Sequence, residues 1–218
     1  MTHNYSSGVF CIQRRTFFLR IIFMPLLHTG KQRIVLASQS PRRIELLKKI
    51  ISNFEVNVSK IEENNNGVSS PRELVEKLSR QKAEQVANDI AEGIIIGADS
   101  VVVYNDNILG KPVNANDSKR MLSLLSGKLH QVYTGFTVLQ KPDHTIVSGH
   151  EVTQVKFREL EVWEIEKYIE SGQSSDKAGA YGIQDDAAVF VEAVNGCYYN
   201  VVGLPITRLF LVLKRILK

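Results

Sequence analysis

The chain of 218 residues is 44% hydrophobic, which is enough to bury a substantial core and excludes a disordered or fibrous protein. Five of its 27 Lys and Arg residues lie within residues 1–33, which contain no acidic residue, so residues 34–218 carry 22 basic and 23 acidic side chains. This near-neutral body argues against a general nucleic-acid-binding protein, which would carry a basic footprint. The two cysteines, Cys11 and Cys197, form neither a disulfide framework nor a zinc-ligand pattern, so a reducing compartment fits best.

Residues 1–32 are predicted to be an N-terminal extension outside the folded domain, either disordered or a targeting segment. Val9 to Leu27 is apolar, but arginines interrupt it, so it is too broken to span a membrane. Its Arg-rich, acid-free composition resembles a mitochondrial transit peptide, while an unstructured extension or a start at Met24 fits equally well. We therefore expect a cytoplasmic protein without a membrane segment, with mitochondrial targeting as the alternative.

Residues 33–218 are predicted to form one α/β domain, with a central mixed β-sheet flanked by helices, because short β-branched runs alternate with amphipathic stretches. The first half predicts a strand at 34–37, a helix at 41–51, a strand at 54–58, a polar loop at 62–69, a long helix from Pro71 to Gly93, and strands at 94–96 and 101–104. The second half predicts a helix at 116–125, an antiparallel pair at 130–139 and 145–157, a helix at 161–170, strands at 189–193 and 198–201, and a last helix from Pro205.

Two arginines, Arg42 and Arg43, occupy the first turn of the first predicted helix, where positive charge opposes the helix dipole. An anion bound at this terminus would remove the conflict, because backbone N–H groups, the hydroxyls of Ser38 and Ser40, and both guanidinium groups could point at it. Phosphate is the natural candidate. A capped helix with solvated arginines explains the same residues equally well.

Asp99 lies inside a run of apolar residues, 94–103, that otherwise belongs in a buried strand. A lone buried carboxylate is costly unless it is paired, bound to a metal or neutralised. The structural alternative is a turn or bulge at Gly97 that Asp99 caps. We favour a functional role for Asp99.

Several other charged side chains are candidates to act with Asp99. Lys82 lies on the long helix and Lys111 follows a short strand, and either could pair with the carboxylate or hold a polyphosphate. Glu63, in the polar loop, could supply an oxygen ligand to a hard cation such as Mg²⁺. Each of these residues by itself is more typical of a solvated surface.

Residues 176–184 form a loop of small residues with polar groups at both ends. Its glycines would let the backbone approach a ligand closely, and the amide of Gln184 can donate and accept, as reading the edge of a planar base requires. A tight structural turn is the alternative. The histidines His130, His144 and His150 have no metal-ligand spacing and are expected to be surface or strand-end residues.

Five motifs in this order resemble those of the Maf family of nucleoside triphosphate pyrophosphatases: residues 38–43 (SQSPRR), 97–100 (GADS), 111–112 (KP), 176–184 (DKAGAYGIQ) and 202–205 (VGLP). The resemblance covers nearly all of the body. It implies hydrolysis of a nucleoside triphosphate to the monophosphate and pyrophosphate with a divalent metal, Mg or Mn. It also implies a fold similar to that of inosine triphosphate pyrophosphatases, and a homodimer.

The resemblance also implies roles for individual residues. Asp99 matches the proton acceptor of the family, and the residues that match its phosphate and metal surroundings are Ser38, Arg42, Arg43, Glu63, Lys82 and Lys111. In the subgroup that acts on dTTP and UTP, the positions of Arg42, Ser100 and Gln184 are associated with substrate choice. Ser100 departs from the usual threonine there, and the loop around Glu63 lacks the usual aspartate-rich form.

The interpretation that follows is a dTTP and UTP pyrophosphatase. Asp99, Lys82 and Lys111 form its catalytic group, Asp99 and Glu63 are its metal ligands, and the substrate-binding residues are Ser38, Ser40, Arg42, Arg43, Ser100 and Gln184. A catalytically weak nucleotide-binding regulator of cell division and a pyrophosphatase that removes modified purine nucleotides such as 7-methyl-GTP are the alternatives.

Overall fold

The computed structural model describes residues 26–60 and 70–217, so most of the N-terminal extension and Glu63 lie outside the described residues. A seven-stranded sheet forms the centre of the fold, in the order β2-β1-β3-β5-β6-β7, with β4 paired to β3. Its strands are β1 (Ile34–Leu36), β2 (Glu55–Val56), β3 (Gly93–Tyr104), β4 (Asn107–Leu109), β5 (Leu129–Lys141), β6 (Thr145–Phe157) and β7 (Val191–Asn195). Strand β1 runs parallel to β2 and β3, whereas all other pairs are antiparallel, which confirms the predicted mixed sheet.

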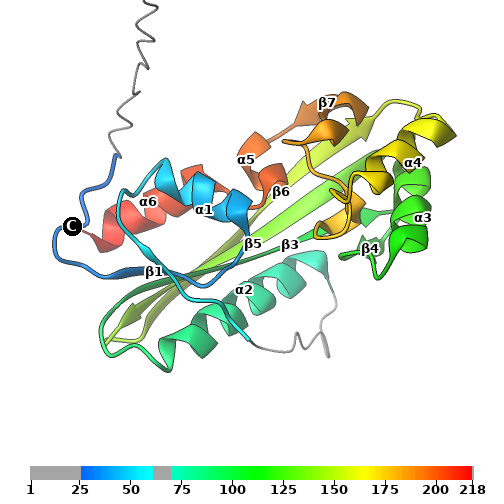
Figure 1. Ribbon diagram of the computed structural model, residues 1–218. Coiled ribbons are helices and arrows are strands. Elements are labelled where there is room, and N and C mark those ends of the chain that lie inside the picture. The colour runs from blue at the N-terminus through cyan, green and yellow to red at the C-terminus, as the bar shows by residue number, and fades with distance from the viewer. Residues whose placement is uncertain (1–25, 61–69, 218) are drawn as a thin grey trace, which may run out of the picture.

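Helices cover both faces of this sheet (Figure 1). Helix α2 (Pro71–Ala87) lies along one face, and α1 (Pro41–Lys48), α5 (Tyr198–Val202) and α6 (Ile206–Ile216) lie over the other. Helices α3 (Ala115–Leu125) and α4 (Val162–Glu170) pack together at one end of the sheet. Within residues 26–60 and 70–217, no helix has both the length and the apolar character needed to cross a bilayer.

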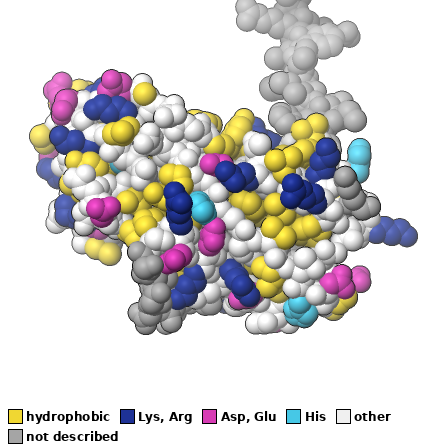
Figure 2. Space-filling model, turned by 180° about the vertical axis from the view of Figure 1, so that it is seen from behind, with side chains coloured by type: hydrophobic (Ala, Val, Ile, Leu, Met, Phe, Trp, Pro, Cys, Tyr) yellow, Lys and Arg dark blue, Asp and Glu magenta, His cyan; other side chains and the backbone are white. Residues whose placement is uncertain are grey.

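The core is divided between the two faces because successive strand residues point to opposite sides. Ile94 and Ile96 of β3 join the larger cluster, which includes Leu46 and Leu47 of α1. Ile95, between them, packs with α2 instead. On the surface that Figure 2 shows, Lys and Arg are interspersed with Asp and Glu, in agreement with the balanced charge of the body.

Three element predictions need correction. Strand β3 runs without interruption through Asp99, paired to β5 in regular register, so neither a break nor a bulge at Gly97 is present. Residues 198–201, predicted as a strand, form helix α5. Residues 186–190 form a 3₁₀ helix, η2 (Asp186–Phe190), so the strand predicted at 189–193 is β7 at Val191–Asn195. The strand-favouring tyrosines and valine of 198–201 are outweighed by tertiary contacts, because the buried amide of Asn200 donates to the Val132 carbonyl and to Thr153 Oγ1, both at 2.9 Å.

Candidate active site

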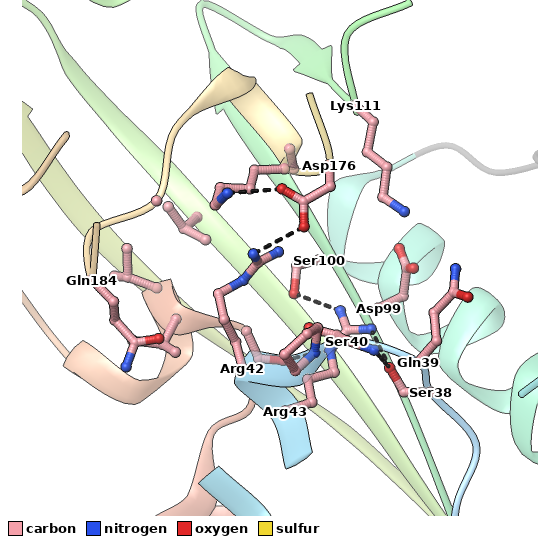
Figure 3. Close-up of a pocket in the computed structure, with 18 of the residues that line it drawn as sticks. Ser38, Gln39, Ser40, Arg42, Arg43, Asp99, Ser100, Lys111, Asp176 and Gln184 are labelled. Carbon is pink, nitrogen blue, oxygen red and sulfur yellow. Dashed lines mark hydrogen bonds and ion pairs between the residues drawn. The ribbon is translucent and has the colours of Figure 1, made fainter. Parts of the chain in front are cut away.

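A cavity of about 400 Å³ opens at the edge of the central strand β3. Nine of the ten predicted site residues line it: Ser38, Ser40, Arg42, Arg43, Lys82, Asp99, Ser100, Lys111 and Gln184. The tenth, Glu63, lies outside the described residues. Segments that are far apart in the sequence therefore meet at one place, as Figure 3 shows for most of these side chains.

The cavity lies at this edge because the neighbours of β3 leave a gap there. Strand β1 pairs with β3 only as far as Ile96, and β4 pairs with β3 only from Val102 onward. Side chains of consecutive strand residues point to opposite faces, so Asp99 faces α2 while Ser100 faces α1. Both line the same cavity, because an open strand edge can be reached from either face of the sheet.

Asp99 has the partner that a buried carboxylate requires. Its Oδ1 accepts a hydrogen bond of 2.5 Å from the ammonium of Lys82 on α2, and the two side chains are 11% and 16% exposed. This ion pair offsets the cost of burying the charge. Lys111, which follows β4, points its ammonium toward the same space (Figure 3).

Arg43 forms part of the cavity wall by joining three segments. Its guanidinium donates to the Gly203 carbonyl at 2.9 Å, to Ser100 Oγ at 3.1 Å and to Ser38 Oγ at 3.4 Å. Ser38 Oγ also accepts from the backbone N–H of Ser40 at 3.2 Å. Arg43 therefore orders the loop after β1 as well as bringing charge to it, whereas the sequence leaves open whether its guanidinium meets an anion or solvent.

Arg42 and the loop at 176–184 meet on the other side of the cavity. Arg42 Nη1 lies 3.1 Å from Asp176 Oδ2, and Lys177 Nζ lies 2.7 Å from Asp176 Oδ1. Burial raises the pKa of Asp176, but hydrogen bonds from Lys177 and Arg42 outweigh it and hold that pKa below its usual value. Gln184 lies on the far side of Arg42 from Asp99 (Figure 3).

Several residues of the cavity were not among the predicted site residues, and three of the polar or charged ones are Gln39, Asp176 and Lys177. All three belong to motifs that the sequence singles out, so their position within those motifs is the signal that could have identified them. With them, the described part of the chain contributes five cationic side chains to the cavity lining, Arg42, Arg43, Lys82, Lys111 and Lys177, against two carboxylates, Asp99 and Asp176. An excess of fixed cations in a concave site attracts an anionic ligand.

The described residues supply only some of the ligands that a metal site needs. Among them, no three His, Cys, Asp or Glu side chains cluster so that they could hold an ion by themselves. Mg²⁺ is usually bound through one or two carboxylates together with substrate phosphates, and Asp99 in an anion-attracting cavity suits such a site. This part of the chain thus offers Asp99 as a ligand to a metal that would arrive with a polyphosphate.

Comparison with known proteins identifies the family. The model of the Maf-like protein family matches residues 33–216 of the chain, which includes all of the cavity. The chain therefore belongs to the Maf family. Membership confirms the resemblance that the five motifs predict, and residues from all five motifs line the cavity.

Individual Maf relatives carry an activity in their names. A protein of Desulforamulus reducens named dTTP/UTP pyrophosphatase is 47% identical over 81% of this chain and 92% of its own length. One of Carboxydothermus hydrogenoformans with the same name is 51% identical over 82% of this chain and 95% of its own length.

The solved structure of a HAM1 protein from Coxiella burnetii matches 84% of this chain and 99% of its own, with a TM-score of 0.46 and 14% identity.

Proposed function

We propose that this Maf protein is a nucleoside triphosphate pyrophosphatase that hydrolyses dTTP and UTP to the monophosphate and pyrophosphate. The observation that carries the proposal is the cavity itself, in which cations surround a buried carboxylate at one end and an exposed amide, Gln184, lies at the other. Relatives at 47–51% identity that bear this name support it.

The reaction is attack by water on the α-phosphorus, which forms the new P–O bond as the bond to the bridging oxygen breaks and pyrophosphate leaves. Asp99 accepts the proton of the attacking water. Arg42, Lys82 and Lys111 offset the charge of the phosphates, and Arg43 and Ser38 hold the loop that faces them. Lys82 keeps Asp99 in place between the substrate and the α2 helix.

A divalent cation, Mg²⁺ or Mn²⁺, belongs to the proposal, with Asp99 and Glu63 as its protein ligands. Such an ion supplies charge neutralisation of the leaving pyrophosphate. Substrate choice is assigned to Arg42, Ser100 and Gln184, with Gln184 reading the edge of the base. We further propose a homodimer that binds neither nucleic acid nor membrane and works in the cytoplasm, with the mitochondrion as the alternative.

The test measures pyrophosphate release with Mg²⁺ or Mn²⁺ across dTTP, UTP, CTP, dCTP, ATP, GTP, ITP and 7-methyl-GTP. We expect the fastest turnover with dTTP and UTP. In Asp99→Asn we expect kcat to fall by at least about a few hundredfold, because a positioned base contributes 10² to 10⁴ in rate. Asp89→Asn, a matched change of an exposed aspartate at the end of α2, should retain wild-type turnover.

Other outcomes would contradict the proposal in distinct ways. Near-wild-type turnover in Asp99→Asn removes Asp99 from its role. Calorimetric binding of dTTP without any hydrolysis favours the regulator, and preference for 7-methyl-GTP or ITP favours the purine-directed enzyme.

A further inference from the structure

A tyrosine outside the cavity is bonded to the loop that carries Gln184. Tyr168, on α4, is 4% exposed and is not part of the cavity lining. Its hydroxyl donates to Asp185 Oδ1 at 3.1 Å and accepts from the backbone N–H of Gly182 at 3.2 Å. The two bonded positions lie on either side of Ile183 and Gln184, so the hydroxyl spans the segment that presents the Gln184 amide.

Asp185 extends this connection along the loop. Its Oδ1 also accepts from the backbone N–H of Ala187 at 3.1 Å, and its Oδ2 lies 3.3 Å from Lys177 Nζ. The packing is tight, since a Cβ at Gly182 would lie 2.3 Å from Asp185 Oδ2. One carboxylate and one hydroxyl therefore bond to the loop at positions 177, 182 and 187.

The Tyr168 hydroxyl is held as a permanent donor. Burial and the adjacent charge of Asp185 raise the pKa of Tyr168 far above its usual value, so the hydroxyl keeps its proton. The ring is fixed as well, because it packs edge-on against Phe190 with the ring centroids 5.4 Å apart. A rigid ring with a fixed donor is suited to define where a loop lies.

We infer that Tyr168 and Asp185 are positioning residues for base recognition: they fix the backbone at 182–184 so that Gln184 meets the edge of the nucleotide base. This inference rests on the proposed function, in which Gln184 reads the base. Tyr168 does not line the cavity, and its hydroxyl bonds directly to the two residues that flank Ile183 and Gln184, so we expect its effect at the base end of the cavity.

The test is Tyr168→Phe, which keeps the packed ring and removes the hydroxyl. We expect KM for UTP and dTTP to rise about five- to tenfold, as the loss of one or two hydrogen bonds predicts, while kcat changes by less than about twofold. The preference for UTP over CTP should fall by about the same factor as KM rises, about five- to tenfold. Inhibition by tripolyphosphate, which has no base, should stay unchanged.

Tyr133→Phe is the matched control. Tyr133 is also mostly buried, and its hydroxyl donates to Gln131 Oε1 at 2.9 Å. It packs with residues of α2 and does not line the cavity, so KM, kcat, the UTP/CTP preference and inhibition by tripolyphosphate should equal those of the wild type. Unchanged KM and unchanged UTP/CTP preference in Tyr168→Phe would overturn the inference. So would an equal loss of tripolyphosphate inhibition, because that result marks a general disturbance of the cavity.

Two further measurements keep the result decisive. Should Tyr168→Phe not fold, judged by its thermal midpoint, Asp185→Asn tests the same loop through KM for UTP and the UTP/CTP preference. Tripolyphosphate is not used for this variant, because Asp185 also lies 3.3 Å from the cavity cation Lys177. Should the wild type not hydrolyse dTTP or UTP, the proposed function fails, and calorimetry then decides the inference. Weaker binding of dTTP by the variant with equal binding of tripolyphosphate supports it, and equal binding of both overturns it.

Discussion

The backbone carbonyl of Ser79 on helix α2 lies so close to Gly97 of strand β3 that a Cβ at position 97 would be 2.1 Å from its oxygen. Gly135 on the neighbouring strand β5 allows the same approach, with a Cβ 2.2 Å from the Val75 carbonyl oxygen. Lys82 follows Ser79 by about one helical turn. The depth at which α2 lies on the sheet therefore decides whether the Lys82 ammonium reaches Asp99.

Gly97→Ala should move α2 outward, because the added methyl meets backbone that cannot rotate away. We expect a loss of about 1–3 kcal/mol in the free energy of unfolding, the usual cost of overpacking. We also expect kcat to fall at least about tenfold, since a shift of about 1 Å at a site costs that much or more. Urea unfolding and steady-state kinetics measure the two effects.

Gly110→Ala is the control for this change, because a Cβ at Gly110 would have no neighbour within 4 Å. Wild-type stability and turnover in Gly97→Ala would show that the depth of α2 does not govern the site.

Lys82→Met should leave the carboxylate of Asp99 without its ammonium partner in a nearly buried position. Breaking a fully buried pair costs about 3–5 kcal/mol, and the partial exposure here reduces our expectation to about 2 kcal/mol. The double variant Lys82→Met with Asp99→Asn should recover part of that loss, because no unpaired charge remains. Strictly additive losses in urea unfolding of the two single variants and the double variant would contradict a direct ion pair.

Arg43→Lys should lower kcat/KM by about tenfold or more, although the charge is kept. A single ammonium cannot reproduce the guanidinium fork that reaches Ser38, Ser100 and the Gly203 carbonyl together. Arg80→Lys, at an exposed position on α2, should leave the kinetics unchanged. Equal kinetics in Arg43→Lys and the wild type would show that charge alone, and not the fork, is required.

His130 should make the protein less stable in mild acid. The sequence predicts a surface or strand-end histidine, but His130 is 2% exposed, and its Nε2 lies 2.9 Å from the Tyr181 hydroxyl. Burial lowers its pKa from 6.5 to about 4, so between these values the unfolded chain binds a proton that the folded protein does not. Its contribution to stability is fully present above pH 6.5 and falls by up to about 3 kcal/mol as the pH drops to 4.

His130→Gln removes this titration and keeps a polar partner for Tyr181, so its unfolding free energy should depend less on pH between 6.5 and 4. His144→Asn, at an exposed turn, should retain the wild-type dependence. Identical pH profiles for His130→Gln and the wild type would mean that His130 is not the group responsible.

Much of the molecule could be predicted from the sequence, because the signals are local. The period of apolar residues locates helices α2 and α3, and the capping residue Ser70 also marks the start of α2, since a cap bonds within its own turn. The boundaries and state of 198–202 could not be predicted in this way, since contacts from Asn200 to two distant strands decide them.

The sequence by itself determined which chemical groups this protein has, the order of its motifs and the mixed α/β class, because spacing and composition carry that information. Only the tertiary structure decided which of those groups act together. Asp99 could have been paired with Lys82 or Lys111, and Arg43 could have reached solvent. The choice depends on the end of β1, the open edge of β3 and the close approach of α2. The contacts that set these features join segments up to 160 residues apart. Such long-range geometry leaves no periodic trace along the chain.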